Sequence, residues 1–332
     1  MQNGTDNSSA VDSGTGLPLV IVNPKSAGGS TQTRWSEIAS DLRSHFGPYT
    51  VALTKRPGDG TDIAERFIAS GRRFIIACGG DGTINEVANG VIRSGEDVTM
   101  GIVPAGTGGD LRRSLGISST PREAARQLRV GVTREVDAGK VAFTDFEGRP
   151  AERYFLNVAS FGLSASINDR VKKKGSFAWI PSETVRGKTK FALSTLQEVF
   201  DPEFKIVNVA IDGEPATRLA TLNFCICNAR FFGGGMQIAP DAKLDDGLLD
   251  LVNIGDLTTL RILLNSYKLY SGTHLALPEV KSRLVKRIEA STADPSEFID
   301  FETDGEIPGR LPAVFEIVAK AIKLRVPAPE RH

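Results

Sequence analysis

Three glycine-rich segments in the first third of the chain each follow directly on a short apolar run. The segments are 23–29, 79–83 and 104–110, and the runs before them are 17–22, 73–78 and 98–103. Stretches with helical spacing of apolar residues separate the runs. This alternation is typical of a parallel sheet covered on both faces. Ligands of such sheets bind beyond the carboxyl ends of the strands, where all three glycine-rich segments would lie.

The pattern changes near residue 134, after which strand-like segments dominate. These segments are 134–143, 154–163, 204–211, 219–228, 248–254, 298–302, 313–319 and 322–326. We therefore expect an N-terminal α/β nucleotide-binding domain with a parallel sheet over residues 17–132. A β-rich antiparallel sandwich domain is expected over residues 133–327. Residues 1–16 are rich in small polar side chains and are expected to form a disordered tail, and 328–332 form a second, short tail.

Two helices are expected within the second domain. One covers residues 182–200. The other begins after Asp256, a predicted N-cap, and its apolar side carries Leu260, Leu263, Leu264 and Tyr267.

Composition and sequence pattern argue against several classes of protein. Lys and Arg together number 40, as do Asp and Glu, so the formal net charge of zero gives no support for nucleic-acid binding. Three cysteines do not suggest a disulfide framework. No apolar run approaches the roughly 20 residues of a membrane span. The first residues lack the basic start and apolar core of a signal peptide, so we expect a cytoplasmic protein.

The segment Gly-Gly-Asp-Gly-Thr at 79–83 joins an apolar strand to a helix. Glycines let the backbone approach a ligand closely, and the free N–H groups of a helix start attract phosphate. Asp81 can hold Mg²⁺ directly or through water. Taken alone, the segment could equally be a tight turn with a capping aspartate. The next glycine-rich segment adds a hydroxyl at Thr107 and a carboxylate at Asp110, and neither segment is a Walker A loop or a Rossmann fingerprint.

Together these motifs resemble the diacylglycerol kinase catalytic-domain family. The similarity rests on Asn-Pro-Lys-Ser at 23–26, Gly-Gly-Asp-Gly-Thr, Pro-Ala-Gly-Thr-Gly-x-Asp at 104–110 and a late Asp-Gly-Glu at 304–306. That family includes soluble bacterial diacylglycerol kinases, YegS-like lipid kinases, and sphingosine and ceramide kinases. Segments 154–162 and 240–251 are also similar to it, so the resemblance covers about residues 17–327. The Gly-Gly-Asp-Gly-Thr loop alone is shared with NAD kinases.

The resemblance implies an enzyme that uses ATP and Mg²⁺ to phosphorylate a lipid hydroxyl. The positions that would contact ATP are Asn23, Pro24, Lys25, Ser26, Thr54, Gly79, Gly80, Asp81, Gly82, Thr83, Ile84, Asn85, Gly106 and Thr107. Asp81 and Asp110 would organise Mg²⁺ and its waters. Phosphoryl transfer depends mainly on positioning and on neutralising phosphate charge, which such loops supply.

Two further sites are implied by the resemblance. Glu306, beside Asp304, matches the general base of bacterial members. In sphingosine kinases the aspartate of the Gly-Gly-Asp-Gly-Thr motif is credited with that role, so Asp81 is the competing candidate here. An identical Asp-Gly-Glu stands at 212–214, and either tripeptide could be only a hairpin turn. A structural Mg²⁺ site is implied at Asp246 with the backbone carbonyls of Lys243 and Leu248. The alternative there is a plain Asp-Gly turn.

Some features depart from the family or leave the function open. Gly109 replaces the usual asparagine of the Gly-Thr-Gly-Asn-Asp motif, which removes an amide donor. The segment 172–180 combines lysines with bulky apolar residues and could touch lipid headgroups or be a solvated charge run. A lipid substrate implies transient, peripheral contact with a membrane surface, and the family includes homodimers. The alternatives are an NAD-kinase-like enzyme for a soluble substrate and an inactive lipid-binding protein.

Overall fold

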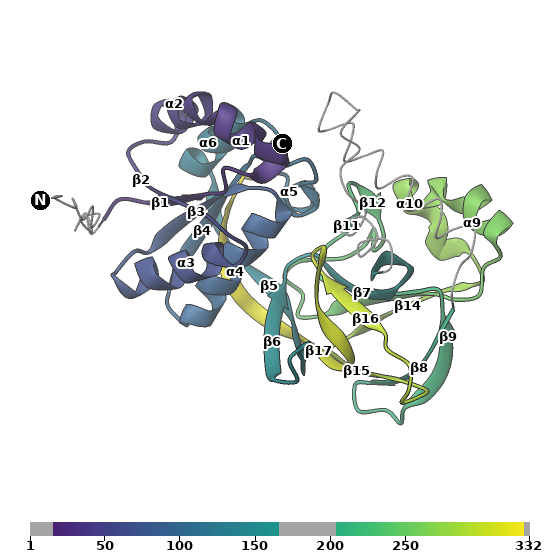
Figure 1. Ribbon diagram of the computed structural model, residues 1–332. Coiled ribbons are helices and arrows are strands. Elements are labelled where there is room, and N and C mark those ends of the chain that lie inside the picture. The colour runs from purple at the N-terminus through teal and green to yellow at the C-terminus, as the bar shows by residue number, and fades with distance from the viewer. Residues whose placement is uncertain (1–15, 166–203, 329–332) are drawn as a thin grey trace, which may run out of the picture.

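The computed structural model describes residues 16–165 and 204–328, and Figure 1 shows them as two domains joined by long strands. The N-terminal domain contains β1 (Leu19–Val22), η1 (Ser26–Gly29), α1 (Ser30–Thr33), α2 (Trp35–His45), β2 (Thr50–Leu53), α3 (Asp59–Ala69), β3 (Phe74–Gly79), α4 (Asp81–Ser94), β4 (Thr99–Pro104), α5 (Asp110–Ser114) and α6 (Pro121–Val130).

The second domain follows without a linker. It contains β5 (Val132–Thr144), β6 (Pro150–Phe155), β7 (Val158–Gly162), β8 (Lys205–Ile211), β9 (Thr217–Thr221), β10 (Asn223–Cys227), β11 (Phe231–Phe232), β12 (Met236–Gln237), β13 (Leu249–Ile254), α9 (Thr259–Asn265), α10 (Tyr267–Ser271), η2 (Thr273–Ala276), β14 (Val280–Val285), β15 (Arg287–Thr292), β16 (Asp300–Thr303) and β17 (Glu306–Val326).

The N-terminal sheet is parallel, as predicted, with strands in the order β2-β1-β3-β4. Alternate residues of β1 enter different cores because successive side chains of a strand point to opposite faces. Leu19 and Ile21 pack with helices α3 and α4, whereas Val20 and Val22 pack with α2 and α6. Helices thus cover both faces of the sheet, which explains why β1, β3 and β4 are continuous apolar runs.

The second domain is the expected antiparallel β sandwich. Strands β14, β13, β10, β7 and β16 pair in that order, and β8, β15, β17 and β5 form the facing layer. Its core is rich in phenylalanine: Phe161 and Phe224 stack with ring centroids 4.7 Å apart, and Phe301 meets Phe315 edge to face at 5.5 Å. Such ring pairs stabilise a core beyond the area they bury.

The last strand, β17, joins the two domains. The sequence predicts two strands here, but the structure has one of 21 residues with a register shift between Val318 and Ile322. At that shift Lys320 has a φ of 52°, and its backbone N–H donates to the buried Asp137 carboxylate at 2.7 Å. Beyond the shift, β17 pairs in parallel with β4 through Lys323 and Leu324. One continuous sheet therefore runs through both domains.

Several sequence predictions of local structure need correction. The helix expected after Asp256 begins at Thr259, and its N-cap is Thr258, whose extended backbone conformation (ψ 150°) ends the preceding loop. The single strand expected at 219–228 is split at Leu222 into β9 and β10. The expected tail 1–16 (apart from its last residue), helix 182–200 and basic segment 172–180 lie outside the described residues.

Candidate active site

The three glycine-rich loops meet at the carboxyl ends of β1, β3 and β4, as the sequence predicts. The backbone N–H of Asn23 donates to the Cys78 carbonyl at 3.0 Å, and its side-chain amide donates to Thr83 Oγ1 at 3.0 Å. The N–H of Ala105 donates to the carbonyl of Gly79 at 2.8 Å. These bonds hold the loops as one unit at the sheet edge.

Glycine is required where the second and third loops touch. A Cβ on Gly106 would lie 2.3 Å from the Cα of Gly80, which is backbone and cannot yield. A Cβ on Gly108 would lie 2.3 Å from Asp81 Oδ2. Gly109 has a φ of 81°, in the left-handed region that glycine and asparagine tolerate best. The replacement of asparagine at 109 therefore keeps the backbone conformation of the loop.

Asp81 is the first residue of α4 and faces the third loop. Its Oδ2 accepts a hydrogen bond of 2.6 Å from the N–H of Gly109. Its Oδ1 is buried and has no hydrogen-bond partner among the described residues. Because a buried carboxylate oxygen without a partner is costly, this atom marks a position suited to a cation or a donor from outside the chain.

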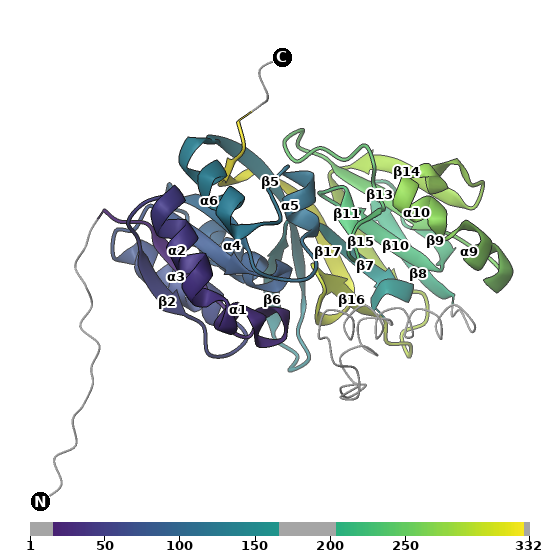
Figure 2. The ribbon, with the colours of Figure 1, turned by 90° about the horizontal axis from the view of Figure 1, so that it is seen from above.

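Asp110 connects the two domains. Its Oδ1 accepts from the Arg113 guanidinium at 2.7 Å, and its Oδ2 accepts from the N–H of Gly234 at 2.9 Å. Burial raises the pKa of the Asp110 carboxyl and nearby Asp81 raises it further, whereas Gly234 and Arg113 act in the opposite direction. Gly234 lies between β11 and β12, and Figure 2 shows β11 beside α5. Sequence reasoning missed this contact, although the glycine triplet at 233–235 was a visible signal.

The late Asp-Gly-Glu forms a two-residue hairpin turn between β16 and β17. Asp304 and Gly305 have φ values of 48° and 85°, and Thr303 pairs with Glu306 across the turn. Both are turn residues because they tolerate positive φ. Glu306 is exposed at the start of β17.

The Asp304 carboxylate fixes this turn to the rest of the site. It accepts the backbone N–H groups of Leu156, Asn157 and Val158 at 2.8, 2.9 and 3.1 Å. It also accepts the side-chain amide of Asn85 in α4 at 2.8 Å. Burial raises the pKa of Asp304, although these donors oppose the rise. With four donors satisfied inside the chain, Asp304 positions the turn that carries Glu306.

The identical tripeptide at 212–214 is also a hairpin turn, but it lies elsewhere. Asp212 has a φ of 51°, and its carboxylate accepts the N–H groups of Lys286 and Arg287 at 2.8 Å each. Glu214 forms an exposed ion pair with Arg283 at 2.9 Å. Both tripeptides form hairpin turns, and of the two only the one at 304–306 is bonded to α4.

The remaining predicted ATP residues differ in exposure. Thr54 is buried and its N–H donates to the Val22 carbonyl at 2.9 Å, which places it beside the first loop. Lys25 and Thr107 are exposed at the rim. Ile84, in the first turn of α4, is buried in the core between this helix and the sheet, so its side chain does not face the loops.

The turn predicted to hold a structural Mg²⁺ ion has one hydrogen bond within itself and one to β5. Asp246 Oδ1 accepts from the N–H of Leu248 at 3.1 Å, and the N–H of Gly247 donates to Asp137 at 2.7 Å. Lys243 is exposed on the same turn. Burial raises the pKa of nearby Asp250 to about 6, and Asp246 adds to this rise. Within the part of the chain that the structure describes, no group of three or more His, Cys, Asp or Glu side chains could hold a metal ion.

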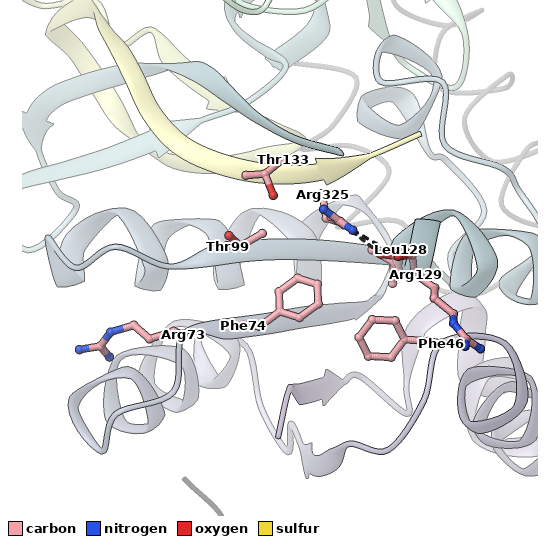
Figure 3. Close-up of a pocket in the computed structure, with 8 residues that line it drawn as sticks. All are labelled: Phe46, Arg73, Phe74, Thr99, Leu128, Arg129, Thr133 and Arg325. Atoms are coloured by element: carbon pink, nitrogen blue, oxygen red, sulfur yellow. Dashed lines mark hydrogen bonds between the residues drawn. The ribbon is translucent and has the colours of Figure 1, made fainter. Parts of the chain in front are cut away.

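A separate hollow of about 330 Å³ lies at the opposite edge of the N-terminal sheet (Figure 3). It is lined by Phe46, Arg73, Phe74, Thr99, Leu128, Arg129, Thr133 and Arg325. Phe74 and Thr99 begin β3 and β4, whereas the glycine-rich loops follow the ends of these strands. Since ligands of parallel sheets bind at the carboxyl ends, this hollow is not the site formed by the loops.

Comparisons with known proteins agree with the geometry. Residues 18–141 match the model of the diacylglycerol kinase catalytic domain, and residues 157–326 match that of the YegS C-terminal NAD kinase beta sandwich-like domain. Diacylglycerol kinase from Bacillus subtilis (strain 168) is 27% identical over 93% of this chain and 95% of its own length. Diacylglycerol kinase from Mycobacterium tuberculosis (strain H37Rv) is 26% identical over 81% of this chain and 82% of its own.

The fold is also that of a solved structure. A crystal structure of a diacylglycerol kinase from Bacillus anthracis str. Sterne superimposes with a TM-score of 0.71 at 26% identity, covering 94% of this chain and 97% of the other. Among residues 16–165 and 204–328, no helix has the length and apolarity to cross a membrane. Since the two family models together span most of the sequence, the chain belongs to the diacylglycerol kinase family of lipid kinases.

Proposed function

We propose that the protein transfers the γ-phosphate of ATP to the hydroxyl group of a diacylglycerol-like or sphingoid-like lipid. The observation that carries this proposal is the convergence of three glycine-rich loops at one sheet edge, beside an Asp-Gly-Glu turn bonded to the same helix, α4. The loops offer backbone N–H groups for phosphates, and the turn offers a carboxylate for the acceptor hydroxyl. Residues 23–26 and 79–85 with Thr54, Gly106 and Thr107 would bind the nucleotide.

Mg²⁺ fits the residues present at this edge. The buried Asp81 Oδ1 lacks a partner within the described chain, and oxygen ligands are those that Mg²⁺ prefers. Bound there, the ion would neutralise charge on the transferring phosphate. The carboxylate of Asp110 is occupied by Arg113 and Gly234. We therefore assign Asp110 the role of holding the two domains and the third loop in place around the ion. A structural ion at Asp246, with the carbonyls of Lys243 and Leu248, remains a further proposal.

Glu306 is the proposed general base. It is exposed at the start of β17, so a lipid hydroxyl can reach it, and Asp304 beside it is fully engaged in positioning the turn. Glu306 would accept the hydroxyl proton as the oxygen attacks the γ-phosphorus and ADP leaves. Asp81 is the competing candidate for this role. The lipid substrate implies a cytoplasmic enzyme that visits the membrane surface, and homodimer formation stays a prediction.

The test is transfer of labelled γ-phosphate from ATP, with Mg²⁺, into detergent-dispersed lipids. Glu306→Gln should lower kcat by about 10²–10⁴-fold while ATP affinity is retained. Glu214→Gln is the matched control, because the same tripeptide stands in the same kind of turn, and it should leave kcat unchanged. Normal turnover by Glu306→Gln would transfer the base role to Asp81. Label entering NAD but no lipid would favour the soluble-substrate alternative.

A further inference from the structure

The helical segment formed by α9 and α10 carries large apolar side chains on its solvent side. The exposed fraction is 64% for Leu260, 63% for Leu264, 63% for Tyr267 and 58% for Tyr270, and Leu263 is also exposed. Helical spacing puts these five positions on one side, since the residue between the two helices, at 266, is itself in the right-handed helical conformation. These five residues are called the outer apolar face below.

The opposite side of the same segment is what anchors it. Leu269 packs against the core under β10 and β13, and Leu257, before α9, is buried. Gln237 in β12 donates to the Tyr270 carbonyl at 2.9 Å. The outer apolar face is therefore not needed to hold the helices on the domain. Several large apolar side chains exposed together indicate a surface that another body covers.

The charges around the outer apolar face favour one kind of surface. From residue 257 to residue 278 the sequence has no Asp or Glu, although acidic and basic residues are equal in number over the chain. Arg261 and Lys268 flank one edge of the face, and Arg261 pairs with Glu279. Leucines and tyrosines edged by basic residues are typical of helices that lie in a membrane interface. Arg261 is neutralised by its pair with Glu279, so two copies meeting through the face would bring their Lys268 side chains against a surface to which residues 257–278 contribute no acidic side chain.

The outer apolar face is connected to the candidate active site by one hairpin. Helix α10 contacts β12, β12 pairs with β11, and Gly234 between them donates to Asp110. Figure 1 shows α10 next to β12, with α9 farther out on one side and β11 and then α5 on the other. A surface that held α10 would therefore be linked through this hairpin to Asp110 of the third glycine-rich loop.

We propose that the outer apolar face docks on the surface of a phospholipid bilayer that contains anionic lipid. This inference rests on the proposed lipid kinase function for its purpose, because docking there brings the site to a substrate that resides in the bilayer. The leucines and tyrosines enter the interface between headgroups and acyl chains, and Lys268 contacts the anionic headgroups.

The first experiment measures co-sedimentation of the full chain with vesicles of equal parts phosphatidylcholine and phosphatidylglycerol. The double variant Leu260→Ser, Leu264→Ser should bind these vesicles at least about tenfold more weakly than wild type. The matched control is Leu53→Ser, Leu284→Ser, which changes two leucines of similar exposure (52% and 53%) elsewhere and should bind within about twofold of wild type. Lys268→Glu should weaken binding to the anionic vesicles and leave the weaker binding to pure phosphatidylcholine unchanged.

A fluorescence reporter locates the contact independently of these losses. Tyr267→Trp should show a blue shift on vesicle addition, after subtraction of the wild-type signal from Trp35 and Trp179. Phe298→Trp, at a residue that is 71% exposed between β15 and β16 and lies against Arg310 of β17, should show none. Equal shifts at both positions, or no shift at 267, would overturn the proposal, as would unimpaired binding by the double variant or no binding by wild type.

Two further results distinguish membrane docking from a contact between two copies of the chain, and from the lipid kinase proposal. If wild type is a dimer that the double variant dissociates, and vesicle binding is unchanged, the outer apolar face is a contact between copies and the proposal is wrong. The double variant should still phosphorylate lipid in detergent micelles, where docking is not required. If no lipid takes label in micelles but vesicle binding follows the expected pattern, the lipid kinase proposal fails while the docking proposal stands.

Discussion

The two Asp-Gly-Glu turns allow one substitution to be tested in two settings. Asp304→Asn and Asp212→Asn each replace a carboxylate with an amide at the same position of the same kind of turn. Asparagine tolerates positive φ as aspartate does, so neither variant strains the backbone. The difference between them comes only from the bonds that each carboxylate accepts.

At residue 304 each carboxylate oxygen accepts two hydrogen bonds. Oδ1 accepts from Asn157 and Val158, and Oδ2 accepts from Leu156 and Asn85. An asparagine has one oxygen, so two buried donors lose their acceptor whichever way its amide turns. An unsatisfied buried donor costs about 1–3 kcal/mol, so Asp304→Asn should lower the free energy of unfolding by roughly 2–6 kcal/mol.

Asp212 provides the control. Both donors at this turn, the N–H groups of Lys286 and Arg287, bond to the single atom Oδ1. The carbonyl oxygen of an asparagine can accept both, so Asp212→Asn should cost less than about 0.5 kcal/mol. Urea denaturation followed by circular dichroism measures both values. Equal losses of stability in the two variants, or a stable Asp304→Asn protein, would refute the argument that Asp304 acts as a buried acceptor.

Three further predictions concern the loops and the second domain. Gly106→Ala places a Cβ 2.3 Å from the Cα of Gly80 and should weaken nucleotide binding at least about tenfold by calorimetry; wild-type affinity in this variant would contradict the role given to the close contact between the loops. Asp81→Asn should raise the Mg²⁺ concentration needed for half-maximal activity at least about tenfold, because it replaces a carboxylate that has an unpaired buried oxygen; an unchanged Mg²⁺ requirement would place the ion elsewhere. Burial lowers the pKa of His274, so protonation favours the unfolded chain. Its stability contribution is complete above the ordinary histidine pKa and should decline below it by up to about 1.4 kcal/mol per pH unit; His274→Gln should flatten that decline in urea denaturation across the pH range.

The N-terminal domain was predictable because each of its signals is local. Strands β1, β3 and β4 are apolar runs buried on both faces, and the loops that follow them carry their glycines in the sequence itself. The meeting of the loops then follows from the parallel arrangement of the strands. Thr83 and Asn23 therefore came together as expected, 60 residues apart in the chain.

What the sequence could not predict depends on contacts between distant segments. The carboxylate of Asp304 accepts hydrogen bonds from Leu156 and Asn85, which lie 148 and 219 residues earlier in the chain. Nothing in the sequence near residue 304 therefore indicates that this carboxylate positions the turn. The helical spacing of apolar residues in α9 predicted an apolar side. Spacing alone does not show whether that side packs on the domain or faces away from it. The sequence predicts two strands in place of β17 because the apolar pattern breaks at Lys320, where the strand leaves the sandwich and joins the parallel sheet. That the strand continues through the break depends on its partners in both domains.

Helix α4 relates the two halves of the proposed chemistry. Asp81 and Asn85 are four residues apart and so lie on the same side of the helix. Asp81 accepts from the third glycine-rich loop, and Asn85 donates to Asp304 in the turn that carries Glu306. The proposed metal-binding carboxylate and the proposed base are thus positioned from one rigid element, although they come from different domains. The turn at residues 212–214 has no bond to α4, which explains how identical tripeptides can have different roles in one chain.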